Sequence, residues 1–193
     1  MTMDSADNRF FILNLLTNFR SYNAEEEQSR LEIIEFVQNN KECFDNTFQK
    51  GHITGSALVV DSAFERTLLT HHVKLEKWFQ FGGHSDSDPN TLAVGLREAT
   101  EESCLTSLKF VPGYVGIFDV DVHPIKETEK MPLHNHFDIR ILLTADIKEA
   151  FTVTHESKDL KWVLLDNVAE YNTQPAFLRL VEKARKVKAR LQS

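Results

Sequence analysis

The sequence contains few cysteines and no long apolar run. Its 193 residues include only two cysteines, Cys43 and Cys104, which are too few for a disulfide framework and too far apart for a zinc knuckle. No stretch approaches the roughly 18 apolar residues of a membrane span, and the apolar run from Phe10 to Leu16 is interrupted by Asn14. The first seven residues are acidic where a secretory signal would be basic. We therefore expect a cytoplasmic protein without membrane contact.

Basic charge is also scarce. The chain has 22 Lys+Arg against 29 Asp+Glu, a net charge of −7, which excludes a general nucleic-acid coat protein because such proteins need a basic face for phosphates. The charge permits a phosphate substrate that is held through a divalent metal. The basic residues near the C-terminus complement the dipole of a terminal helix, with RNA binding as a minor alternative. They are Arg179, Lys183, Arg185, Lys186, Lys188 and Arg190.

The hydrophobic pattern predicts a single domain over residues 1–193, of α/β or α+β class, in which helices flank a mixed sheet. Residues 1–48 are predicted to form an N-terminal helical extension, in which Asn23 caps a second helix and Glu26 lies three residues on. A homodimer interface on these helices is an open alternative. The remaining elements follow in the order strands, one inner helix, strands, helix. We expect strands at 56–60, 66–70, 78–81, 115–123, 137–144 and 160–165, an inner helix from Pro89 through Glu102, and a last helix from about residue 173.

Three glutamates share one face of the predicted inner helix. Glu98, Glu101 and Glu102 stand at i, i+3 and i+4, where like charges repel each other by a few tenths of a kcal/mol per pair. A cluster of hard oxygen ligands becomes favourable when Mg²⁺ or Mn²⁺ binds. The Gly82-Gly83 pair before the helix lets the backbone approach the same point. A solvated acidic helix face is the competing interpretation.

The stretch from Gly82 to Leu105 resembles the Nudix (MutT-like) box, G-x5-E-x7-R-E-U-x-E-E-x-G-U, where U is a bulky aliphatic residue. Gly83 takes the first glycine position and Leu105 the last aliphatic one. The run Arg97-Glu98 and the pair Glu101-Glu102 match in register. Pro89 stands where the first glutamate belongs and Cys104 stands where the closing glycine belongs, and Ala99 is smaller than the usual aliphatic residue at its position. We expect Asp86 or Asp88 to take over the supporting role of that glutamate, and the turn at Cys104 to be strained or differently built.

The resemblance implies a Nudix pyrophosphohydrolase, which hydrolyses a phosphoanhydride in a nucleoside diphosphate linked to another moiety with Mg²⁺ or Mn²⁺ as cofactor. Glu101 and Glu102 would be metal ligands together with the Gly82 carbonyl. Glu98 would be a further ligand or help to activate water, and Arg97 would orient the glutamates. Nudix enzymes often supply a further acid from a late loop, and either Glu156 or Asp159 could be that base here.

Two later segments carry polar residues at every second position. Alternation by two places such residues on one face of a strand, with apolar residues on the other. A solvent-facing side of the sheet would explain the pattern, but three histidines with three aspartates are unusual for such a face. The segments resemble a Nudix subgroup with Asp-x-Asp-x-His and His-x-His-x-Asp-x-Arg strands after a Gly-Gly-His box, so we predict that they line the substrate cleft and bind phosphate, an auxiliary metal or the nucleoside. The predicted substrate-binding residues are His84, Asp119, Asp121, His123, His134, His136, Asp138 and Arg140.

Two alternatives remain beside the hydrolase. One is a nucleotide-binding or regulatory Nudix module with little or no turnover, which the departures at Pro89 and Cys104 favour slightly. The other is an enzyme similar to isopentenyl diphosphate isomerases, which have a histidine ligand at a place similar to His84 but a catalytic cysteine where Gly82 and Gly83 stand here. The sequence assigns no role to His52.

Overall fold

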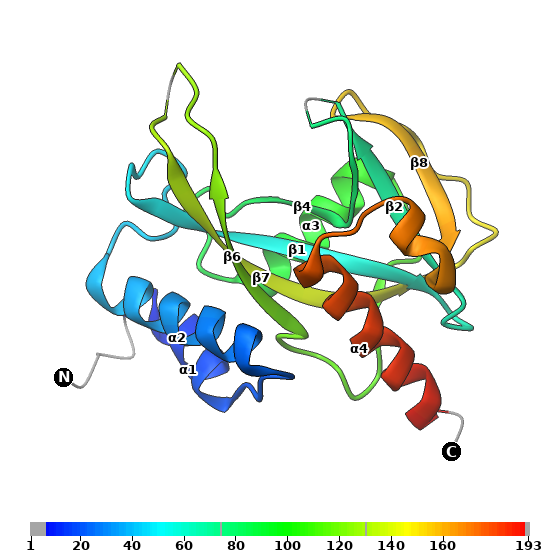
Figure 1. The fold of residues 1–193 in the computed structure, drawn as a ribbon, viewed down its shortest axis with the longest axis horizontal. Helices are drawn as coiled ribbons and strands as arrows, with labels where there is room; N and C mark the ends of the chain where they lie inside the picture. The colour runs from blue at the N-terminus through cyan, green and yellow to red at the C-terminus, as the bar shows by residue number, and fades with distance from the viewer. Residues whose placement is uncertain (1–6, 74, 130, 192–193) are drawn as a thin grey trace.

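The computed structural model describes residues 7–73, 75–129 and 131–191, and it has a mixed sheet with helices on both sides (Figure 1). This confirms the predicted fold class. Residues 1–6, where the sequence argued against a leader, lie outside the described part of the chain. None of the helices in the described ranges is long and apolar enough to cross a membrane.

Strand β1 (Gly51–Asp61) is the centre of the sheet. Along one edge it pairs in parallel with β7 (His134–Ala145) over its whole length. Its other edge is shared by two antiparallel strands: β4 (Phe81–His84) pairs with its first half, and β2 (Arg66–His72) pairs with its last residues. Because β4 and β2 diverge from one edge of β1, the sheet splits at that point.

The other strands extend both edges. β6 (Asp119–Ile125) and β5 (Lys109–Phe110) pair with successive parts of β7, and β8 (Ser157–Leu164) and β3 (Trp78–Phe79) pair with β2. The described residues thus form one eight-stranded sheet.

Two helices cover opposite faces of β1, as its alternating side chains require. Ala57 and Val59 are buried in the cluster that includes residues of α3 (Thr91–Ser103). Leu58 and Val60 are buried with α4 (Pro175–Leu191), which follows the short 3₁₀-helix η1 (Leu165–Glu170). Figure 1 shows α4 in front of the sheet and α3 behind it. Each face therefore has its own apolar core.

The N-terminal helices α1 (Phe10–Asn18) and α2 (Ala24–Asn39) form a third apolar cluster with β6 and β7. The Asn23 side chain accepts a hydrogen bond from the Glu26 N–H at 2.9 Å, as predicted, which is worth about 1 kcal/mol to the helix. The Glu26 carboxylate in turn accepts from the Tyr22 N–H. These two hydrogen bonds cap the first turn of α2 and explain why this helix begins at Ala24.

Several predicted boundaries were wrong. The inner helix begins at Thr91 with Asn90 as its N-cap, because the Asn90 side chain accepts from the Ala93 N–H, so Pro89 lies outside it. The strand predicted at 78–81 is divided between β3 and β4, and Gly82-Gly83 lie within β4 because this stretch pairs with β1. Residues 115–118 are not in a strand, since pairing with β7 begins at Asp119. The pattern also missed the two-residue strand β5.

Candidate functional site

Helix α3 presents two of its glutamates toward the sheet. Glu98 and Glu102 are one helical turn apart and only 8% and 7% exposed, whereas Glu101 points into solvent. The helix can lie close to β1 because Gly95 has no side chain: a Cβ there would meet the Ser56 carbonyl oxygen at 2.9 Å. The close approach buries both carboxylates against β4.

The Gly82-Gly83 backbone meets these carboxylates directly. The Gly82 N–H donates to Glu102 Oε1 at 2.9 Å. A Cβ on Gly83 would lie 2.8 Å from Glu98 Oε1 and closer still to its other carboxylate oxygen, so only glycine leaves room for Glu98. The two glycines of the box therefore set the positions of both buried glutamates.

Arg97 holds the remaining side of the cluster. Its guanidinium lies 2.9 Å from Glu98 Oε1 and 3.2 Å from Glu101 Oε2, and it donates to the His84 carbonyl at 2.8 Å. These contacts place Arg97 against two of the glutamates, and its orienting role stays a prediction. Asp86 lies 3.7 Å from the same guanidinium, a place suited to the support that Pro89 does not provide.

The two buried glutamates are difficult to ionise. Burial raises the pKa of Glu98 to about 7, even though Arg97 acts in the opposite direction. Burial likewise raises the pKa of Glu102 to about 7, against the hydrogen bond from Gly82. The negative charge of Glu156 adds to both shifts, and the side chain of this late-loop residue is 58% exposed. Two buried carboxylates that share one neighbouring guanidinium have the chemistry to attract a cation.

The closing turn of the helix is strained, as the departure from glycine suggests. Cys104 adopts the left-handed conformation at φ 58° and ψ 19°, and its N–H donates to the Thr100 carbonyl at 2.8 Å. A non-glycine residue in this region costs roughly 1–2 kcal/mol. The turn of the box is therefore kept, at a cost in stability.

Strand pairing places the second polar set on one face. Asp119 pairs with Arg140, Asp121 with Asp138, and His123 with His136. The Arg140 guanidinium is 4% exposed and contacts all three carboxylates, at 2.8 Å to Asp138, 2.9 Å to Asp121 and 3.4 Å to Asp119.

Helix α4 closes one end of this polar face. Asp119 is fully buried and is held by Arg179 at 2.8 Å and Lys183 at 3.1 Å, and Lys183 also pairs with Glu26 of α2. Burial opposes the ionisation of Asp119, but Arg179, Arg140 and Lys183 hold its pKa at about 2. The interpretation of this face as a solvated side of the sheet is therefore wrong at this end. These contacts give Asp119 a structural role, and its place in the substrate cleft stays a prediction.

Histidines gather at the other end of the same face. His123, His134 and His136 lie beside His84 of β4 and beside His52, and neighbouring ring centroids are 4.7–5.6 Å apart. Burial and the neighbouring rings lower the pKa of His52 to about 4 and that of His136 to about 2. His52 could not be selected from the sequence, because its register with His136 across β1 and β7 is a tertiary contact.

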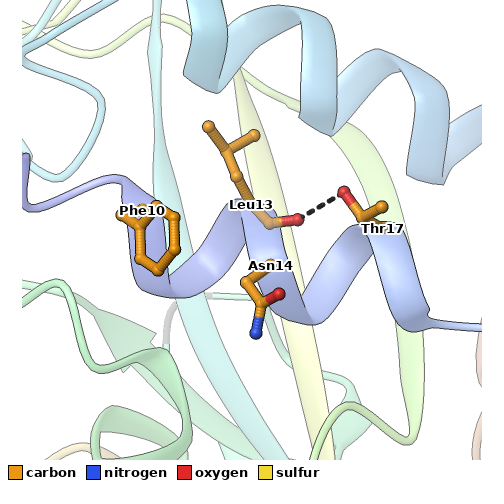
Figure 2. A pocket seen from close by; sticks show the side chains of 4 residues that line it. All are labelled: Phe10, Leu13, Asn14 and Thr17. Carbon is orange, nitrogen blue, oxygen red and sulfur yellow. Dashed lines mark hydrogen bonds between the residues drawn. The ribbon is translucent and has the colours of Figure 1, made fainter. Parts of the chain in front are cut away.

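A surface pocket elsewhere carries no such chemistry. Figure 2 shows it on α1, lined by Phe10, Leu13, Asn14 and Thr17, with the Thr17 hydroxyl donating to the Leu13 carbonyl at 2.7 Å. Its lining has no titratable group. The glutamate and histidine clusters are thus the stronger candidates for function.

No protein-family model matches the chain, and no curated protein matches it with statistical significance. Solved structures do match its fold. An Ap4A hydrolase of C. elegans in a binary complex covers 72% of this chain and 97% of its own, at 16% identity and a TM-score of 0.53. RenU, a Nudix hydrolase of M. smegmatis, covers 73% and 88%, at 20% identity and a TM-score of 0.52. The Nudix domain of Shewanella oneidensis NrtR, solved with ADP-ribose, covers 79% and 96%, at 17% identity and a TM-score of 0.50. The chain has the Nudix fold.

Proposed function

We propose that this chain is a metal-dependent Nudix hydrolase that cleaves a phosphoanhydride bond in a nucleoside diphosphate linked to another moiety. The Nudix fold and the box in register support the reaction class. The observation that carries the proposal is the pair of buried carboxylates, Glu98 and Glu102, which the Gly82-Gly83 backbone and Arg97 hold together.

The donor set fits Mg²⁺ or Mn²⁺. Carboxylates and a backbone carbonyl are the hard oxygen ligands that these ions prefer, and burial without matching positive charge makes the two glutamates favour a cation. Glu98, Glu102 and the Gly82 carbonyl would hold it, and Glu101, whose side chain is exposed, would have to turn toward the ion to join them. When bound, the ion would neutralise the diphosphate and make water a better nucleophile.

The side chains around the glutamates have separate tasks in this proposal. Arg97 keeps Glu98 and Glu101 in place through its two ion pairs and binds β4 through the His84 carbonyl. We assign the role of general base to Glu156, whose exposed side chain could accept a proton from water and whose charge acts on both buried glutamates. A base outside the buried cluster can exchange that proton with solvent.

The polar face of β6 and β7 is the proposed substrate surface. Its exposed end offers hydrogen-bond donors and acceptors, while the Arg140 network fixes their positions. The residues proposed to face substrate are His84, Asp121, His123, His134, His136, Asp138 and Arg140. We propose a cytoplasmic location, which the small number of cysteines in the sequence favours.

Turnover of a substrate panel tests the proposal. Dinucleoside polyphosphates and ADP-ribose belong in the panel because the matched Ap4A hydrolase and the NrtR domain act on or bind them, along with sugar nucleotides and damaged nucleotides. We expect release of phosphate or nucleotide that requires Mg²⁺ or Mn²⁺ and is lost in Glu102→Gln. Glu35→Gln, on the exposed face of α2, is the matched control and should keep full activity.

If no compound of the panel is hydrolysed but some still raise the melting temperature, the hydrolase is rejected in favour of a nucleotide-binding module. Turnover that persists in Glu102→Gln would reject the glutamate site.

A further inference from the structure

Three histidine side chains from three strands converge beside the glutamate cluster. His52 lies on β1, His84 on β4 and His136 on β7, and one ring nitrogen from each lies within 4.8 Å of the others. The register of the sheet brings these residues together. His52 pairs with His136 across β1 and β7, and His84 pairs with Thr54, which is two residues beyond His52 on β1.

His52 is the most informative of the three. It is 1% exposed, and neither of its ring nitrogens has a hydrogen-bond partner among the residues that the structure describes. Both nitrogens of a buried imidazole normally have hydrogen-bond partners, because a buried polar atom without a partner destabilises the folded state. An unpaired nitrogen that is buried and directed at two further imidazoles has the arrangement of a metal ligand.

We propose that His52, His84 and His136 bind one divalent transition-metal ion, for which Zn²⁺ fits best. Imidazole nitrogens are ligands of intermediate softness that select Zn²⁺, Co²⁺ or Ni²⁺ over Mg²⁺. Tetrahedral Zn²⁺ with bonds of about 2.0–2.1 Å needs ligand nitrogens about 3.4 Å apart, so nitrogens that lie within 4.8 Å of one another close in by at most about 1.4 Å when the ion binds.

Three protein ligands leave the fourth tetrahedral position for a further ligand. His134 lies beside the trio, with its ring centroid 5.0 Å from that of His52. Its Nδ1 is 2.8 Å from the Pro132 carbonyl, so Nδ1 carries the proton and Nε2 keeps its lone pair. Three protein ligands with one open position is the arrangement of an ion that can also contact an anionic group of a bound molecule.

This site shares no ligand with the glutamate cluster. β4 joins the two, because the Gly82 N–H binds Glu102 and the His84 carbonyl accepts from Arg97, while the His84 ring belongs to the histidine site. The ligand types also differ, with oxygen in one site and nitrogen in the other. The two sites are therefore expected to select different ions and to respond to different substitutions.

Cobalt binding tests the proposal without any enzyme assay. The full-length protein is stripped with chelator and titrated with Co²⁺, whose visible absorption reports a tetrahedral nitrogen site, and then with Zn²⁺ as competitor. We expect one equivalent of Co²⁺, displaced by Zn²⁺ and not by millimolar Mg²⁺. Zn²⁺ at about 100 times its Kd should raise the melting temperature by about 5–10 °C.

Variants locate the ion. His84→Ala should weaken Co²⁺ binding by more than about 100-fold. A residue that only hydrogen-bonds to a metal ligand would cost about 10- to 100-fold, so a larger loss identifies His84 as a ligand. The His84 side chain is exposed, so this variant should fold where His52→Ala could fail. His155→Ala is the matched control, because that side chain is 91% exposed, and Glu102→Gln should bind Co²⁺ as the unchanged protein does.

Absence of Co²⁺ bands and of any Zn²⁺-dependent rise in melting temperature would overturn the proposal. So would binding that His84→Ala leaves intact, or binding that Glu102→Gln abolishes.

Discussion

Glu102→Gln should stabilise the metal-free protein at the same time as it removes turnover. The side chain is 7% exposed, and burial raises its pKa from 4.5 to about 7. The unfolded chain, in which this carboxyl has its ordinary pKa, releases its proton more easily than the folded chain does. Stability therefore falls as the pH rises from about 4.5 to 7, because ionisation is cheaper in the unfolded state.

The size of the effect follows from the two pKa values. Above pH 7 a carboxyl with a pKa of about 7 in place of 4.5 lowers the free energy of unfolding by about 3 kcal/mol, and at pH 5 by about 1 kcal/mol or less. Glutamine keeps the Gly82 N–H partner through its amide oxygen and carries no charge. At 2–4 °C per kcal/mol for a chain of this size, the variant should melt about 6–12 °C higher at pH 8.

Thermal unfolding in chelator, followed by circular dichroism at pH 5 and pH 8, measures the difference. Glu101→Gln is the matched control, since its side chain is 59% exposed and its melting temperature should stay unchanged. A gain of equal size at both pH values, or a variant that melts lower at pH 8, would refute the reasoning.

Three further substitutions follow from the geometry. Gly83→Ala should lower kcat by more than about 100-fold with folding retained, because its Cβ displaces the Glu98 carboxylate; unchanged kcat would contradict the site. Cys104→Gly should raise the free energy of unfolding by about 0.5–1 kcal/mol in urea titrations, since glycine relieves the left-handed strain at some cost in chain entropy. Asp119→Asn should lower the free energy of unfolding by about 3–5 kcal/mol, because Arg179 is left buried without its partner. A loss below about 1 kcal/mol would refute the stabilising role of this buried ion pair.

Local patterns accounted for much of the fold. The N-cap at Asn23, the hairpin of β1 and β2 and the helix that carries Glu98 and Glu102 were all predictable, because capping, alternation and helical spacing act between residues close in the chain. The resemblance to the Nudix box, which predicted the fold, also rests on residues close in the chain. Boundaries were less accurate where pairing partners decide them, as at the division between β3 and β4.

The residues themselves determined which groups could do chemistry, namely three carboxylates at one helix face and polar side chains at alternate strand positions. Only the tertiary structure decided what each group does. The approach of Gly82-Gly83 to α3 desolvates Glu98 and Glu102, and α4 encloses Asp119. The parallel register of β1 with β7 brings His52 to His136, more than eighty positions along the chain. Burial and register depend on contacts between distant segments, and these set the charge states and the neighbours of every side chain in the site.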